Sequence, residues 1–144
     1  MKIVLQRVLS AKVKFGNEKR EIGYGIAIFV GIGTSDTEEI IFPLVKKILN
    51  LRIFEDEEKK MNFSILDVKG DILVVSEFTL YGDCFSGNRP DFGLAKEPKE
   101  AEILYNKFVE ELKNSGLKVM TGKFRSYMQV EIVNDGPVTF ILEK

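Results

Sequence analysis

The chain has 144 residues, of which 44% are hydrophobic and 30% are charged, and its net charge is −1. This balance is typical of one globular domain covering residues 1–144. It excludes the strongly basic surface with which proteins bind long nucleic acids, so any RNA contact is expected at an RNA end or in a cleft. The chain has no histidine and a single cysteine, Cys84, which excludes Ser-His-Asp and Cys-His catalysis and leaves no ligand set for zinc.

The first predicted elements are strands. Side chains of Lys2–Phe15 alternate between apolar and polar, which predicts one long or broken strand. Gly16-Asn17 is a turn signal, and the mainly apolar segment Glu21–Gly31 predicts a buried strand. Within that segment, Gly23 and Gly25 indicate a bend or the close approach of another backbone.

A helix is predicted next. Asp36 is a suitable N-cap residue, and Glu38 and Glu39 would then lie in the first turn, near the positive end of the helix dipole. Apolar residues recur at helical spacing from 40 to 49. Pro43 predicts that this helix begins nearby or kinks there.

The second half of the chain continues with strands and one more helix. Residues 60–67 and 71–81 predict two strands joined by a turn at Lys69-Gly70, and 82–98 is a long irregular segment of a kind that is often functional. Pro98 is suited to the first position of a helix that Gly116 ends. Strands are predicted at 117–121, 126–133 and 138–142, with a turn at 134–137.

Together these elements predict an α/β (α+β) fold, a mostly antiparallel sheet or barrel with two main covering helices. The cytoplasm is the expected location, because a lone cysteine suits a reducing compartment and residues 1–15 lack the apolar block of a signal peptide. The weakly polar run Gly23–Gly33 is too short to span a bilayer, so no membrane contact is expected.

The first candidate site is the segment Ser76-Glu77-Phe78-Thr79, which interrupts an apolar strand with polar residues. Strand alternation predicts that Ser76 and Phe78 point one way while Glu77 and Thr79 point the other. From the pattern alone, an ordinary strand with one polar face is the favoured interpretation.

The second candidate is Asn134-Asp135-Gly136-Pro137. By itself it is most simply a hairpin turn between two strands. The functional interpretation is that Gly136 lets a ligand approach the backbone closely, and that a cis bond before Pro137 places two carbonyl oxygens side by side. Such a pair of acceptors could bind an α-amino group and sense the direction of a side chain.

Three further features are weaker. In Gly87–Phe92, either a plain exposed loop or an RNA contact is possible, with Arg89 on a phosphate and Phe92 against a base. Arg7 is unusual among apolar neighbours, although a paired or snorkelling arginine is the simpler interpretation. The basic stretches Lys59-Lys60 and 118–125 are interpreted first as solvated faces and second as an RNA-facing patch.

With these segments described, the chain resembles the D-aminoacyl-tRNA deacylase family from end to end. No single motif is decisive, but their order and spacing in a chain of this length are specific. The motifs are Gln6-Arg7-Val8, Arg52-Ile53-Phe54, Lys60-Met61-Asn62, Ser76-Glu77-Phe78-Thr79-Leu80, Arg89-Pro90 and Asn134-Asp135-Gly136-Pro137-Val138-Thr139-Phe140.

The resemblance implies a homodimer that hydrolyses the ester joining a D-amino acid, or glycine mischarged on alanine tRNA, to the tRNA 3′ end. It implies that a cis Gly136-Pro137 enters the partner's site and rejects L side chains, while Arg7 orients that motif. Ser76 to Thr79 would line the pocket, with help from the tRNA's own 2′-OH and with Thr79 as nucleophile the less favoured option. Neither a cofactor nor DNA binding is implied. The family usually has glutamine where this chain has Glu77, which puts in doubt any role that needs an amide N–H there.

Three alternatives remain open from the sequence. A relative that edits L-alanine mischarged on tRNA could use the same scaffold with the Gly-Pro carbonyls turned outward. A non-catalytic module could bind an RNA end without cleaving the ester. If the resemblance is accidental, the chain is a small β-barrel of unknown ligand.

Overall fold

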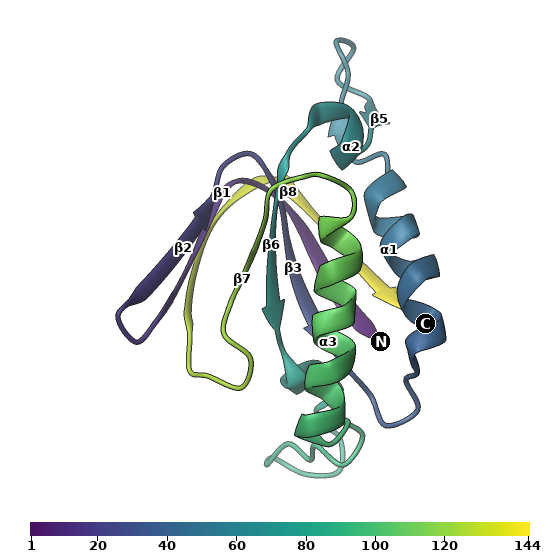
Figure 1. The fold of residues 1–144 in the computed structure, drawn as a ribbon, viewed down its shortest axis with the longest axis vertical. Helices are drawn as coiled ribbons and strands as arrows, with labels where there is room; N and C mark the ends of the chain where they lie inside the picture. The colour runs from purple at the N-terminus through teal and green to yellow at the C-terminus, as the bar shows by residue number, and fades with distance from the viewer.

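The computed structural model describes residues 1–144, which form one six-stranded sheet with helices packed on one face (Figure 1). The long strand β1 pairs antiparallel with β2, β3 and β8, whereas β3–β6 and β6–β7 are parallel pairs. The predicted fold class is confirmed, although the sheet is mixed. The strands are β1 Lys2–Phe15, β2 Glu18–Ile22, β3 Gly25–Gly31, β6 Asp71–Ser76, β7 Val119–Thr121 and β8 Gln129–Glu143.

The helices cover one face of this sheet, and α1 lies beside α3 (Figure 1). Pro98 occupies the first turn of α3 as predicted, where its missing N–H costs no hydrogen bond. No helix is long and apolar enough to cross a membrane. The remaining elements are η1 Glu38–Ile40, α1 Ile41–Asn50, β4 Phe54–Glu55, β5 Met61–Phe63, α2 Ile65–Val68, η2 Phe78–Tyr81 and α3 Pro98–Lys113.

Strand β1 contributes to two separate cores. Ile3 and Leu5 pack under the helices, while Val13 and Phe15 belong to a second apolar cluster on the opposite face of the sheet. The ladder between β1 and β8 shifts register on either side of Val8, where the paired strands bend. The central strands β3 and β6 are therefore covered on both faces, which explains why they are almost entirely apolar.

The segment predicted as one strand, Glu21–Gly31, is divided. Glu21 and Ile22 end β2, and the chain bends before β3 begins at Gly25. The expected close approach is found at Gly25, where a Cβ atom would lie 1.9 Å from the backbone oxygen of Asp71. Only glycine allows β3 and β6 to pair at this point.

Asp36 is not the helix N-cap that the sequence predicts. The residue before η1 is Thr37, whose side chain makes no capping bond, and α1 follows from Ile41 with Pro43 in its first turn. Asp36 is instead buried, and its carboxylate binds the Met1 ammonium and the N–H of Gly33. A buried ion pair across 35 positions of sequence leaves no local signal.

The strand predicted at 60–67 is also wrong in part. Only Met61–Phe63 is extended, because the Ser64 and Asp67 side chains form a reciprocal capping box that begins α2. Helix α2 then ends at Lys69, which adopts the left-handed conformation. The turn predicted at Lys69-Gly70 is therefore confirmed.

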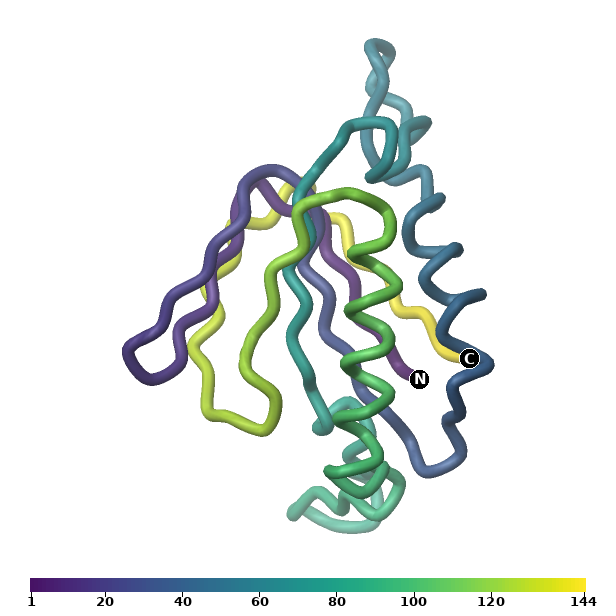
Figure 2. Tube along the Cα trace, viewed as in Figure 1, coloured from purple at the N-terminus to yellow at the C-terminus, as the bar shows by residue number.

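The C-terminal segment does not form the predicted hairpin. Strand β8 runs along β1 on both sides of residues 134–137, since Val133 pairs with Ser10 and Thr139 pairs with Gln6. Asn134 to Pro137 therefore form an irregularity within one long strand rather than a chain reversal. The two chain ends lie side by side (Figure 2), and the Met1 ammonium donates to the Lys144 carbonyl oxygen at 2.7 Å.

Candidate active site

A cavity of about 720 Å³ lies at the carboxyl end of β6, beside the first turn of α3. Ligand sites in sheets with parallel strands commonly lie at this end of the strands. Four separate segments of the chain meet there, and most of the lining residues are apolar. The lining residues are Val30, Ile32, Val75, Ser76, Glu77, Phe78, Phe92, Ala95, Lys96, Glu97, Pro98, Ala101, Phe124, Arg125, Ser126, Tyr127, Met128 and Val130.

The predicted segment 76–79 forms one side of this cavity. Strand β6 ends at Ser76, and the Glu77 N–H donates to the Val30 carbonyl oxygen at 2.8 Å before the chain turns into η2. Strand alternation therefore does not apply beyond Ser76, and the prediction that Ser76 and Phe78 oppose Glu77 and Thr79 is wrong. Ser76, Glu77 and Phe78 all line the cavity.

Thr79 is linked to the cavity through a hydrogen bond to Glu77. Its hydroxyl donates a hydrogen bond to the Glu77 carboxylate. No base partner for this threonine was assigned from the sequence. The 3₁₀ turn brings them together, and it places an anionic oxygen beside a hydroxyl at the edge of the cavity.

The loop 82–97 contributes an aromatic side of the cavity. Phe92 packs edge-to-face on Phe78, with ring centroids 4.9 Å apart, and both rings line the cavity. Arg89 is exposed, does not line the cavity and makes no ion pair. The structure thus brings Phe92, but not Arg89, to the predicted pocket strand.

Several cavity residues are not among the sites predicted from sequence. Ala101 lies in the helix that the sequence predicts from Pro98, and Arg125 lies in a basic stretch interpreted first as a solvated face. Lys96 has a side chain that is 11% exposed, and its ammonium donates to the Thr34 carbonyl oxygen at 2.9 Å. Phe124 and Tyr127 come from the loop between β7 and β8, about 50 positions from Ser76, and no local pattern indicates that meeting.

The second predicted motif lies elsewhere. Gly136 and Pro137 are exposed, their peptide bond is cis, and Gly136 has a φ of 122°. Arg7 is buried and donates to the Ile53 carbonyl oxygen at 2.7 Å. Its Nε lies 2.9 Å from a carboxylate oxygen of Asp135, at an angle that makes this contact an ion pair rather than a hydrogen bond.

Gly136 and the cavity are at opposite ends of the sheet. Asn134 lies opposite Val8, which pairs with Gly25, and Gly25 pairs with Asp71 at the start of β6. On β6 the cavity lining begins at Val75, four residues beyond Asp71, so the two sites are separated by about 13 Å along the strand at about 3.3 Å per residue. In Figure 1 the bend of β8 lies at the top of the sheet and the arrowhead of β6 at the bottom.

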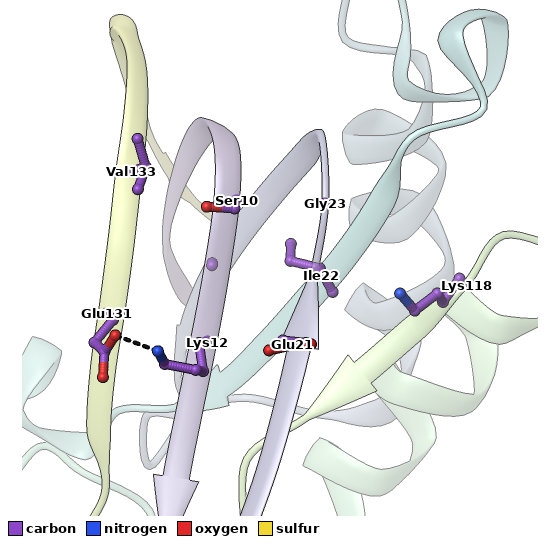
Figure 3. A pocket seen from close by; sticks show the side chains of 9 residues that line it. Ser10, Lys12, Glu21, Ile22, Gly23, Lys118, Glu131 and Val133 are labelled. Atoms are coloured by element: carbon purple, nitrogen blue, oxygen red, sulfur yellow. Dashed lines mark ion pairs between the residues drawn. The ribbon is translucent and has the colours of Figure 1, made fainter.

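A second hollow of about 540 Å³ lies over β1, β2 and β8 (Figure 3). Its charged side chains are already paired: Lys12 contacts Glu131 at 2.5 Å, and Lys118 contacts Asp71 at 2.9 Å. Lys12 and Lys14 hold the pKa of the Glu131 carboxyl at about 2. With Glu21 paired to Lys19, every charged side chain of this hollow is engaged in an ion pair.

The chemistry available in the main cavity is that of carboxylates and hydroxyls. Two carboxylates line the cavity. The Glu97 carboxylate accepts the Lys99 N–H at the start of α3, whereas the Glu77 carboxylate accepts a hydroxyl, that of Thr79. Lys96 and Arg125 supply positive charge at the lining. No group of three or more Cys, Asp or Glu side chains is arranged to hold a metal ion.

Comparison with known proteins covers almost the whole chain. A family model described as D-Tyr-tRNA(Tyr) deacylase matches residues 4–143. Proteins named D-aminoacyl-tRNA deacylase from Thermodesulfovibrio yellowstonii and Halothermothrix orenii are each 54% identical, over 96% and 99% of this chain and 96% and 97% of their own lengths.

Two solved structures share the fold. One, named c-Myc DNA Unwinding Element Binding Protein, is 47% identical with a TM-score of 0.92 over 100% of this chain and 99% of its own. The other, described as a probable eukaryotic D-amino acid tRNA deacylase, has a TM-score of 0.87 at 18% identity, over 98% of this chain and 97% of its own. At that identity the second match supports the fold alone.

Proposed function

The chain belongs to the D-aminoacyl-tRNA deacylase family, and from this premise we propose that it hydrolyses the ester joining a D-amino acid or glycine to the 3′ end of tRNA. It is a hydrolase of aminoacyl-tRNA, and the cytoplasm, where charged tRNA is used, is the proposed location. The proposed site is the cavity at the end of β6, with Ser76, Glu77, Phe78 and Thr79 at the reacting group.

The observation that carries the assignment is the cavity itself. Its volume of about 720 Å³ lies within the range of roughly 300–1,000 Å³ that holds small ligands, and it can accommodate an aminoacyl group with its terminal adenosine. Aromatic residues such as Phe78 and Phe92 suit an unstacked base or an aromatic amino acid. Lys96 and Arg125 suit the RNA phosphates.

In the proposed reaction, water adds to the ester carbonyl carbon, and the tetrahedral intermediate then releases the ribose oxygen. The products are free amino acid and tRNA. The neighbouring 2′-OH of the tRNA assists, while the segment 76–79 orients the ester and stabilises the developing oxyanion. Thr79 acts through its bond to Glu77 and positions that carboxylate.

Selection against L-amino acids is proposed to come from a second copy of the chain. Gly136-Pro137 lies about 13 Å along the sheet from the cavity of its own chain and is not among the residues that line it. The exposed motif is free to enter the cavity of a partner in a homodimer, where its carbonyls would receive the substrate's amino group and block an L side chain. The Arg7–Asp135 ion pair would hold the motif in place.

Deacylation of charged tRNA tests this function. Purified protein is expected to release D-tyrosine from D-tyrosyl-tRNA and glycine from glycyl-tRNA, and to leave L-tyrosyl-tRNA and L-alanyl-tRNA intact. Equal rates on glycyl-tRNA and L-alanyl-tRNA would contradict rejection by a backbone barrier and favour the L-alanine editing alternative. Protection of every ester would favour an RNA-end binding module.

The dimer has its own test. Mass by light scattering is expected to be twice 16.4 kDa. In a mixture, a Gly136→Val chain and a Ser76→Trp chain, each inactive alone, should form mixed dimers that regain part of the activity, because one of the two sites then has both intact components. A fully active monomer would contradict a shared site.

A further inference from the structure

Tyr81 closes the 3₁₀ turn that carries the proposed catalytic segment. Its ring packs on the backbone at the end of β3, where the chain has glycine at 31 and 33. A Cβ atom at Gly33 would lie 2.5 Å from the ring of Tyr81, and one at Gly31 would lie 3.1 Å from it. The ring therefore occupies space that any larger residue at position 33 would take. The ammonium of Lys2 lies 5.0 Å from the centre of the ring.

The Tyr81 hydroxyl is held by Asp36. The buried carboxylate of Asp36 accepts three donors: the Tyr81 hydroxyl at 3.2 Å, the Gly33 N–H at 2.6 Å and the Met1 ammonium at 2.5 Å. Burial, together with the negative charge of Asp36, raises the pKa of Tyr81, so the hydroxyl keeps the proton that it donates. Asp36 is thus a fixed acceptor for one end of the turn.

The other end of the turn is held by Glu77. Its N–H donates to Val30 at 2.8 Å, and its carbonyl oxygen accepts the Leu80 N–H at 3.3 Å. Phe78 and Thr79 lie between this attachment and Tyr81. Val30 lies in β3, and Asp36 lies a few residues after this strand. The backbone of one continuous stretch therefore sets the position of both ends of the segment.

We propose that Tyr81 and Asp36 are positioning residues for hydrolysis, which hold Phe78 and Thr79 at the cavity by fixing the carboxyl end of η2. This inference rests on the proposed function for its kinetic consequence. A displacement of about 1 Å in a group that orients the reacting atoms can lower a rate by about 100-fold. Removal of the Tyr81 hydroxyl frees only the far end of a four-residue turn, so the reacting group should move by less than this. We therefore expect about a tenfold loss of kcat.

The experiment compares Tyr81→Phe with Tyr105→Phe. Tyr105 is a matched control, because its buried hydroxyl also donates one hydrogen bond, to the Val74 carbonyl oxygen at 3.0 Å. That oxygen belongs to the middle of β6, which β3 and β7 hold on both sides. Both variants lose one side-chain hydrogen bond, partly buried at Tyr81 and buried at Tyr105, but only Tyr81→Phe removes an attachment of η2.

Two measurements are made on each variant. With D-tyrosyl-tRNA, Tyr81→Phe is expected to lower kcat about tenfold with KM within about twofold, while Tyr105→Phe keeps the kcat of the unmodified chain. Amide hydrogen exchange at Leu80 and Gly82 is expected to accelerate about tenfold in Tyr81→Phe and not in Tyr105→Phe.

The two readouts separate the possible failures. If the unmodified chain hydrolyses no aminoacyl-tRNA, the proposed function fails, and hydrogen exchange still decides whether Tyr81 holds the turn. Unchanged exchange at Leu80 and Gly82 would overturn the positioning role. So would an unchanged kcat in an active enzyme, or an equal loss in both variants.

Discussion

Replacing Arg7 by methionine should destabilise the protein and release the segment that carries Gly136-Pro137. The Arg7 side chain is 4% exposed, so water cannot replace its contacts. The substitution leaves the Ile53 carbonyl oxygen without its charged donor, and removes the ion-pair partner of Asp135, whose side chain is 28% exposed. Methionine has a similar length and fills most of the space.

The magnitude follows from these two contacts. A hydrogen bond to a charged group contributes about 1.5–3 kcal/mol. The ion pair adds about 1 kcal/mol, well below the value for a fully buried pair, because water reaches Asp135. The expected loss of unfolding free energy is about 3 kcal/mol, which lowers the Tm of a domain of this size by roughly 10 °C.

Urea unfolding of four variants tests this reasoning: the unmodified chain, Arg7→Met, Asp135→Asn and the double variant. Asp135→Asn alone should cost about 1 kcal/mol, and the double variant should cost no more than Arg7→Met. Arg7→Met should also lower the ratio of D-tyrosyl-tRNA to L-tyrosyl-tRNA hydrolysis, because residues 134–137 lose their attachment. An Arg7→Met chain whose unfolding free energy lies within about 0.5 kcal/mol of that of the unmodified chain, the usual scatter of surface substitutions, would refute this reasoning.

Three further outcomes are expected. A D-tyrosyl-tRNA that ends in 2′-deoxyadenosine should be hydrolysed at least about 100-fold more slowly, the scale of a lost proton-transfer group, and an unchanged rate would remove the 2′-OH from the mechanism. Glu77→Gln should keep kcat within about tenfold with a flat pH profile, whereas a loss of about 1,000-fold would assign Glu77 as a general base. The Glu131 carboxyl should titrate near pH 2 by NMR and closer to its usual range in Lys12→Met. Because its folded pKa is lowered, the stability from this pair is present above the unfolded pKa and is lost as the pH falls toward 2.

Several features of the fold followed from local chemistry alone. The alternation in Lys2–Phe15 predicted β1, and Pro98 predicted the start of α3, because side-chain period and a missing N–H act within a few residues. Gly25 indicated a close backbone approach, which is the contact with Asp71. The order of short motifs along the chain was enough to indicate the family.

Other features depended on partners far away in sequence. Residues 134–137 have the composition of a turn, but β1 is long enough to pair with both flanking segments, so the ladder continues through them as one strand. Aspartate is a residue type that commonly caps a helix N-terminus, but Asp36 is instead buried as the ion-pair partner of the Met1 ammonium. In both places a long-range pairing outweighed a local preference worth about 1 kcal/mol.

The candidate site shows the same division. Ser76, Glu77 and Phe78 were expected at the pocket because the chain resembles the deacylase family, whereas the strand pattern alone favoured an ordinary polar face. That Thr79 meets Glu77, and that Lys96, Phe124 and Tyr127 complete the cavity, was decided by the end of β6 and by the packing of α3 and the β7–β8 loop around it. Sequence determines which residues prefer a strand, a turn or a cap, because those preferences are local. Only the tertiary structure determines which distant side chains share a cavity, because that depends on how whole elements bury their apolar faces together.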